Sequence, residues 1–106
     1  MRVLQIMAGA EHGGAETYFV DMVIALHRVG LEQKVVIRKN AARAAQLRDA
    51  GLDVAELAFG GLLDFTTKGK LATIIDDFAP DVVQSWMNRS TRFVSRPNNA
   101  AFVHVG

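Results

Sequence analysis

The feature that most constrains the fold of this chain is a regular alternation of short apolar runs with amphipathic stretches. The apolar runs, which are too short for helices and predict buried strands, occupy residues 3–8, 32–38, 52–59, 81–86 and 101–105. The stretches between them carry apolar side chains at helical spacing and predict helices over residues 15–29, 41–50, 66–78 and 90–95. This alternation indicates an α/β fold: a doubly wound, Rossmann-like parallel sheet of about five strands in the order 3-2-1-4-5, with helices on both faces.

Residues that begin and end helices support this pattern. Asn40 has a side chain that can cap the helix that follows it. Gly30 and Gly51 stand where helices must end, since glycine readily adopts the left-handed conformation of a C-terminal cap. Pro80 bounds the third long helix, because proline cannot continue one.

Composition bounds the domain count and excludes several classes of function. A length of 106 residues allows a single domain. Twelve Lys and Arg against eleven Asp and Glu leave a net charge of +1, which is too weak a field for a nucleic-acid partner. The absence of cysteine excludes disulfides, thiolate metal sites and a cysteine nucleophile. No apolar run approaches the ~18 residues of a spanning helix, and the histidines lack the spacing of metal ligands. The sequence therefore predicts neither a metal nor a cofactor.

The loop over residues 9–14 follows the first strand and opens the first helix, where two phosphate-binding motifs must be tested. In a P-loop, Lys and Ser or Thr would follow the last glycine. Ala15 and Glu16 stand there instead, so the phosphate-binding charge and the Mg²⁺ ligand are missing. In a dinucleotide-binding loop, a second glycine would stand at Glu11, whose side chain would crowd a pyrophosphate. NTP hydrolysis and NAD(P) binding are both disfavoured.

Two glycines at the start of the first helix remain. Gly13 and Gly14 let an anion approach the free backbone N–H groups at the positive end of the helix dipole. They equally permit a sharp strand-to-helix turn, and the local sequence leaves both interpretations open. Glu16 either stabilises the first helical turn or contacts a ligand hydroxyl. His12 either touches an acceptor or phosphate or is a solvated loop side chain.

Four segments, in the correct order, carry a family resemblance. They are residues 1–6, 13–16 (Gly-Gly-Ala-Glu), 80–86 (Pro-Asp-Val-Val-Gln-Ser-Trp) and 102–104 (Phe-Val-His). Together with the amphipathic first helix, they resemble the N-terminal domain of retaining glycosyltransferases of the GT-B fold, family 4. The resemblance covers nearly the whole chain at consistent spacing.

The resemblance implies a function. Members of that family have two Rossmann-like domains that face a cleft; the N-terminal one mostly binds the acceptor and the other holds the nucleotide sugar. Residues 1–106 would then belong to the acceptor-side domain of an enzyme of polysaccharide biosynthesis. Such an enzyme would transfer a hexose from a nucleotide-diphosphate sugar to a saccharide or lipid-linked acceptor, without a metal. The implied location is cytoplasmic, including the inner face of the membrane.

The resemblance also implies roles for individual residues. Gly13 and Gly14 would approach the donor diphosphate. His104 matches the cleft histidine of the family and, as the catalytic residue, would contact the transferred sugar or stabilise the developing charge. On local sequence alone, a histidine in an apolar strand is more often a hydrogen-bonded core residue. Asn88 and Arg89 follow the fourth strand and, by position, would lie near donor or acceptor.

The sequence departs from the family pattern in its extent. The C-terminal domain with its E-x₇-E pair of glutamates is absent, so we expect a truncated piece that transfers no sugar on its own. The alternative is a small non-catalytic α/β module for ligand binding or assembly, whose terminal strand leaves an edge open to a homodimer. A phosphoacceptor signalling domain is disfavoured, because Glu11 is a lone acid after the first strand and Phe59 stands where an Asp is needed.

Weaker signals come from isolated residues. Trp86, at the end of the fourth strand, is predicted to be a core or cleft-wall aromatic. Gln5 interrupts the first apolar run. Lys68 and Lys70 leave open a peripheral contact with a membrane that bears a lipid acceptor, although two lysines are far fewer than a polybasic cluster.

Overall fold

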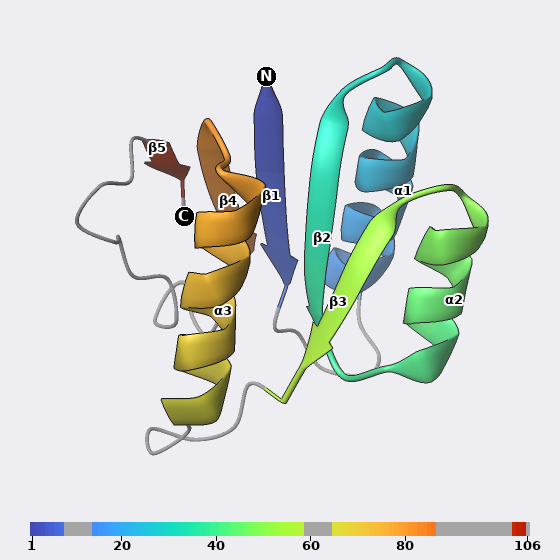
Figure 1. The fold of residues 1–106 in the computed structure, drawn as a ribbon. Coiled ribbons are helices and arrows are strands. Elements are labelled where there is room, and N and C mark those ends of the chain that lie inside the picture. The colour runs from blue at the N-terminus through green and yellow to red at the C-terminus, as the bar shows by residue number, and fades with distance from the viewer. Residues whose placement is uncertain (8–13, 59–64, 87–102, 106) are drawn as a thin grey trace.

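A five-stranded parallel sheet with helices on both faces forms the protein (Figure 1). The computed structural model describes residues 1–7, 14–58, 65–86 and 103–105. The strands are β1 (Arg2–Met7), β2 (Glu32–Arg38), β3 (Asp53–Leu57), β4 (Val82–Trp86) and β5 (Val103–Val105). The helices of the described ranges are α1 (Gly14–Arg28), α2 (Ala41–Asp49) and α3 (Phe65–Phe78). The sheet order is β3-β2-β1-β4-β5, which confirms the predicted doubly wound topology.

The observed bounds of the elements stay close to the predicted ones. Strand β2 has the predicted bounds, whereas β3 is shorter than residues 52–59, since Leu52 precedes the strand and Ala58 follows it. The predicted helix over residues 90–95 lies outside the described residues, as do residues 101–102 of the predicted fifth strand.

Side chains of the strands alternate between two cores because successive residues of a strand point to opposite faces. Leu4 and Ile6 of β1 pack toward α3, whereas Met7 packs toward α1 and α2. The core on the α3 face consists of Leu4, Ile6, Val36, Leu57, Leu71, Ile75 and Val83. The core on the other face consists of Met7, Phe19, Val20, Val23, Val35, Ile37, Ala44, Leu47, Leu52 and Val54. Strands β1 and β2 contribute side chains to both cores. A slip of one residue would turn each of these side chains to the opposite face, so the two cores fix the strand register.

The helix ends follow the signals in the sequence. Gly30 and Gly51 both have φ of 96°, the left-handed conformation expected after a helix. A Cβ added at Gly51 would also lie 2.9 Å from His27 Nε2, so the imidazole would have to shift. The Asn40 side chain accepts a hydrogen bond of 3.0 Å from the backbone N–H of Arg43 and caps α2 as predicted.

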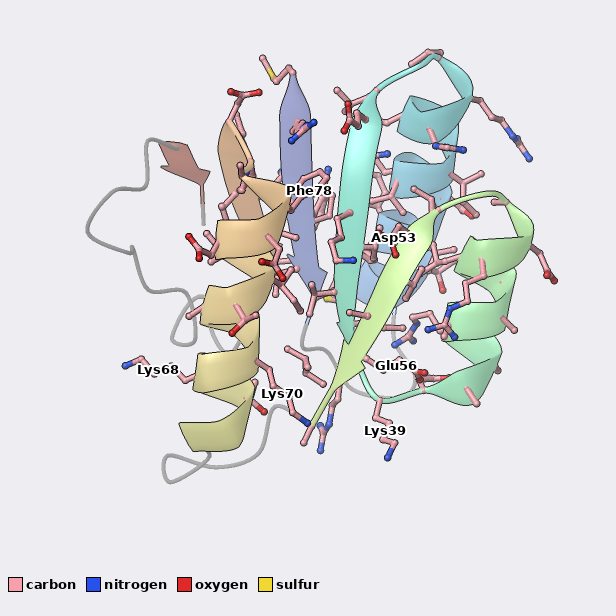
Figure 2. The ribbon with its side chains drawn as sticks, in the orientation of Figure 1. Lys39, Asp53, Glu56, Lys68, Lys70 and Phe78 are labelled. Carbon is pink, nitrogen blue, oxygen red and sulfur yellow. The ribbon has the colours of Figure 1, made fainter. Side chains whose placement is uncertain are left out.

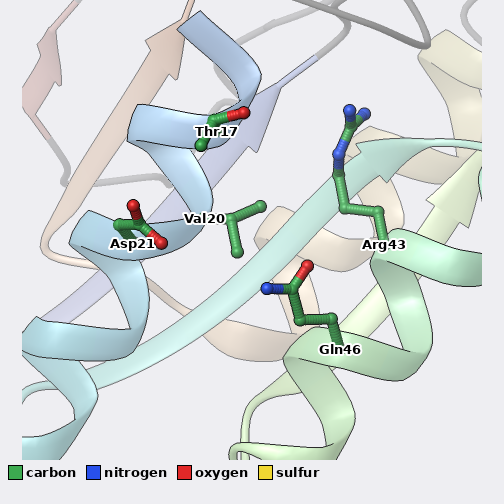
Figure 3. Close-up of a pocket in the computed structure, with 5 residues that line it drawn as sticks. All are labelled: Thr17, Val20, Asp21, Arg43 and Gln46. Atoms are coloured by element: carbon green, nitrogen blue, oxygen red, sulfur yellow. The ribbon is translucent and has the colours of Figure 1, made fainter. Parts of the chain in front are cut away.

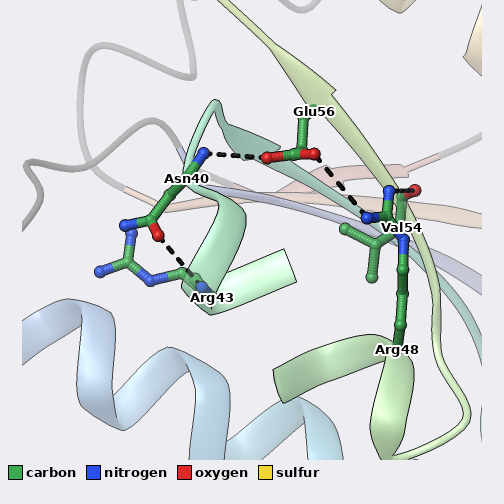
Figure 4. Close-up of polar contacts among 5 residues, drawn as sticks. All are labelled: Asn40, Arg43, Arg48, Val54 and Glu56. Carbon is green, nitrogen blue, oxygen red and sulfur yellow. Dashed lines mark hydrogen bonds and ion pairs between the residues drawn. The ribbon is translucent and has the colours of Figure 1, made fainter. Parts of the chain in front are cut away.

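Glu56 joins helix α2 to the edge strand β3 (Figure 4). Its Oε1 accepts a hydrogen bond of 3.0 Å from the backbone N–H of Asn40, and its Oε2 lies 3.7 Å from Arg48 Nη1. Arg48 Nη2 also donates to the Val54 carbonyl at 3.0 Å. Glu56 thus holds the start of α2 beside β3, and Arg48 joins the last turn of α2 to the same strand.

The amino edge of the sheet is held by contacts of Arg2. Its backbone N–H donates to Asp81 Oδ2, and the Asp81 N–H donates back to the Arg2 carbonyl, both at 2.8 Å. The guanidinium donates to the Phe78 carbonyl at 3.1 Å and lies 3.0 Å from Glu32 Oε2. Figure 2 labels Phe78, whose ring centroid lies 5.9 Å from the guanidinium carbon. The amino ends of β1, β2 and β4 are thus tied together.

Candidate functional site

The topology directs the search to the carboxyl ends of β1 and β4. Strand β1 leads to α1 on one face of the sheet, whereas β4 is reached through α3 on the other face, so the connections diverge between these two neighbours. In doubly wound sheets, ligands bind in the crevice beside the carboxyl ends of the strands at this switch point. Met7 and Trp86 are paired there and end their strands.

The predicted donor-binding segment lies at this edge, as far as the structure describes it. Gly14 is the first residue of α1, and Glu16 follows in its first turn. The N-terminus of α1 therefore lies at the carboxyl edge, beside the end of β1 (Figure 1). The other predicted contacts, His12, Gly13, Asn88 and Arg89, lie outside the described residues.

His104 lies in β5, where the register pairs it with Val83 of β4. Val83 stands three residues before Trp86, the last residue of β4. Along the strand this separates the backbone of His104 from the carboxyl end of β4 by ~10 Å. Figure 1 shows the same offset, with β5 beside the amino-terminal part of β4.

Trp86 is held by a chain of hydrogen bonds that runs across the sheet to α1. The indole Nε1 donates to Gln5 Oε1 at 3.1 Å, and Gln5 Nε2 donates to Gln33 Oε1 at 3.0 Å. Gln33 Nε2 then donates to the Val23 carbonyl of α1 at 2.8 Å. Because the indole N–H only donates and the carbonyl only accepts, one orientation of both amides satisfies the chain. The two glutamines are 1% and 6% exposed, so this chain fixes the orientation of the indole ring.

Two aromatic residues of α1 flank Trp86. The buried Phe19 ring packs edge-on against the indole, with centroids 5.5 Å apart and planes at 75°. The Tyr18 ring lies 6.0 Å from the indole at 55°, and Tyr18 is 63% exposed. Trp86 is half-buried: it packs against the core on the α1 face and contacts the exposed Tyr18 ring.

Sequence reasoning missed Tyr18 and the glutamine pair. Tyr18 stands next to Phe19 in a helix, and nothing local shows which face of the helix borders β4. A glutamine inside an apolar strand is the one signal that could have found the chain, because a buried amide needs partners. Its two partners, Trp86 and Gln33, lie 81 and 28 residues away in the sequence.

Between α1 and α2 lies an open pocket of about 130 Å³ (Figure 3). Thr17 and Asp21 line it from α1, Arg43 and Gln46 line it from α2, and Val20 forms its apolar base. A hydroxyl, a carboxylate, a guanidinium and an amide around one hollow can donate and accept hydrogen bonds, which suits a polar, hydroxylated ligand more than an apolar one.

Exposed lysines surround the carboxyl edge of the sheet (Figure 2). Lys39 follows β2 directly, and Lys68 and Lys70 lie in the first part of α3. The two α3 lysines leave the helix in different directions, so the charges are distributed over the edge. Such a distribution raises the local concentration of an anionic ligand.

Metal and membrane features were sought in the described ranges. Within residues 1–7, 14–58, 65–86 and 103–105, no group of three or more His, Asp or Glu side chains is placed to hold a metal ion. None of the helices in that part of the chain combines the length and apolar character that crossing a membrane requires.

The described elements define a doubly wound α/β domain whose switch point lies between β1 and β4. The sequence matches no family model. It is 36% identical over 96 residues to the lipopolysaccharide core biosynthesis glycosyltransferase LpsD of Rhizobium meliloti (strain 1021). The aligned region covers 89% of this chain and 27% of that protein. Its fold is similar to that of a glycosyltransferase from Rickettsia africae ESF-5, with a TM-score of 0.72 over 97% of this chain and 28% of that one.

The two comparisons carry different information. At 14% identity, the structural likeness shows the fold alone. The sequence similarity relates nearly the whole chain to a part of a glycosyltransferase. The chain spans about a quarter of the length of both proteins.

Proposed function

We propose that this chain is the acceptor-side portion of a sugar-nucleotide-dependent, retaining glycosyltransferase of the GT-B fold, family 4. The enzyme would transfer a hexose from a nucleotide-diphosphate sugar to a saccharide or lipid-linked acceptor in the cytoplasm. The observation that carries this proposal is the 36% identity over 96 residues to a glycosyltransferase of lipopolysaccharide core synthesis. A saccharide of the lipopolysaccharide core type is accordingly the first acceptor to test.

The carboxyl edge suits a donor diphosphate. The N-terminus of α1 begins there with Gly14, and the free N–H groups and dipole of a helix N-terminus favour an anion. Gly14 adds no side chain that would keep a phosphate from the backbone. Lys39, Lys68 and Lys70 add positive charge around the same edge. We therefore assign Gly14, with Gly13, to the donor diphosphate.

His104 is proposed as the residue that contacts the transferred sugar or the developing charge. This role rests on its match to the family motif. We expect the 106 residues alone to transfer no sugar, because the relatives that are named glycosyltransferases are more than three times as long.

The test is a transfer assay on the complete product of the reading frame that encodes this chain. The protein is incubated with uridine- and guanosine-diphosphate hexoses and with core oligosaccharide acceptors, and release of nucleoside diphosphate and growth of the acceptor are both measured. We expect transfer by the complete product, and a loss of kcat/KM of roughly a hundredfold or more in His104→Ala, the range of one charge-stabilising group. Val29→Ala, an exposed site at the amino edge, is the matched control and should transfer normally.

Two results would contradict the proposal in different ways. No transfer from any donor by the complete, folded product would remove the enzyme assignment and leave a binding or assembly module. Normal kinetics in His104→Ala would leave the enzyme assignment standing and would show that His104 has only a structural role in β5.

A further inference from the structure

We propose that Tyr18 and Trp86 form a platform against which one pyranose ring of the acceptor packs. This inference rests on the proposed function, because it names side chains that would bind the acceptor of that reaction. It assigns a ligand to a pair of aromatic rings at the carboxyl edge, beside the N-terminus of α1.

Tyr18 is distinguished by where it is exposed. In the described ranges, the exposed large apolar side chains are Met1, Tyr18 and Val29, at 78%, 63% and 80%. Met1 precedes β1 and Val29 follows α1, so both lie at the amino edge of the sheet. Tyr18 alone among these three lies near the carboxyl edge, one turn into α1. A tyrosine combines a large apolar ring with a hydroxyl, which suits a surface that is apolar on one side and wet on the other.

Trp86 supplies a fixed second wall. Turning its ring would break the bond from Nε1 to Gln5 and leave a buried amide oxygen without its donor. Phe19 packs against the ring edge-on and limits its movement further. A buried indole N–H needs an acceptor in any setting, and here the acceptor also fixes the ring. A binding group gains from being held in place by a second layer of hydrogen bonds before the ligand arrives.

The angle between the rings favours a sugar over a flat ligand. With planes at 55° and centroids 6.0 Å apart, the two rings form a tilted corner rather than one flat surface. A flat nucleobase stacks fully on one ring of such a corner, whereas a chair-shaped pyranose can place C–H groups against both. The hydroxyls of the sugar would point outward, where the exposed carboxylate of Asp21 lies one helical turn from Tyr18.

The chain carries its own reporter for this platform, because Trp86 is its single tryptophan. Methyl glucoside, methyl galactoside and methyl mannoside are titrated into the 106-residue chain while the tryptophan emission is followed, with sorbitol as a polyol that has no ring. We expect a saturable change with at least one glycoside and none with sorbitol. Tyr18→Ala should weaken that binding about tenfold, the value of one aromatic contact. Tyr18→Phe should bind nearly as well, and Val29→Ala should match the unmodified chain.

The outcomes separate this inference from the proposed function. A chain that shows no saturable change with any glycoside, or equal affinity in Tyr18→Ala, overturns the platform. Saturation by uridine diphosphate alone assigns the corner to a nucleotide and overturns it as well. In the complete product, the platform predicts that Tyr18→Ala raises the KM for the acceptor and leaves the KM for the donor unchanged. Unchanged acceptor KM in an active enzyme would reject the platform while the transferase assignment stands.

Discussion

The two edges of the sheet differ in how they use their polar and aromatic side chains. At the amino edge, Arg2 is engaged by Asp81, Phe78 and Glu32, and the contacts connect parts of the protein itself. At the carboxyl edge, the Trp86 indole donates a hydrogen bond to Gln5 and contacts the exposed ring of Tyr18. The polar contacts of the amino edge therefore stabilise the fold. Those of the carboxyl edge instead fix the orientation of Trp86 beside the exposed Tyr18.

The largest expected effect comes from cutting the chain of glutamines. Gln5→Leu would remove the Gln5 acceptor of the Trp86 N–H and the Gln5 donor to the buried Gln33 amide oxygen. Two such losses cost about 2–4 kcal/mol together. We expect the free energy of unfolding in urea to fall by that amount, and glycoside binding at Trp86 to weaken with it.

A double variant is the matched control for this prediction. Gln5→Leu combined with Gln33→Leu removes the unpaired Gln33 oxygen, so it should be no less stable than Gln5→Leu alone. A loss below ~1 kcal/mol in the single variant would show that the amides do not hold Trp86 in place.

A smaller effect is expected at the amino edge. Arg2→Ala removes the ion pair with Glu32 and the bond to the Phe78 carbonyl, but both charged side chains are about half exposed. Solvent screens such contacts, and we expect a loss of ~1 kcal/mol or less in urea unfolding. Glycoside titration of this variant should be unchanged. Weakened glycoside binding in a folded Arg2→Ala chain would break the distinction between the two edges.

Much of the fold could be predicted because its signals are local. The strands are recognisable in the sequence as short apolar runs. Gly30, Gly51 and Asn40 mark helix ends by their own backbone and side-chain chemistry. The sheet order follows from the strand–helix alternation. The observed β3 is shorter than the predicted strand, because Leu52 is buried with the core although it lies outside the strand.

The site could be predicted only in part, because its contacts are not local. The alternation of elements alone predicts Gly14 at the start of the first helix and Trp86 at the end of the fourth strand. The partners of Trp86 come from β1, β2 and α1, and their convergence depends on the register between strands. The register also places His104 beside Val83, a relation that no local pattern contains. The contact of Tyr18 with Trp86 could not be predicted either, because it depends on α1 packing beside the end of β4.

The most direct test of the central claim, that the carboxyl edge is the ligand edge, is a map of amide chemical shifts. The ¹⁵N-labelled chain is titrated with the methyl glycoside that gives the strongest change in Trp86 emission. The account predicts that the shifts concentrate at the Trp86 indole N–H and the backbone of residues 17–19, with Arg2 and Asp81 unchanged. Shifts centred on Arg2 and Asp81, or none at the Trp86 indole, would contradict it.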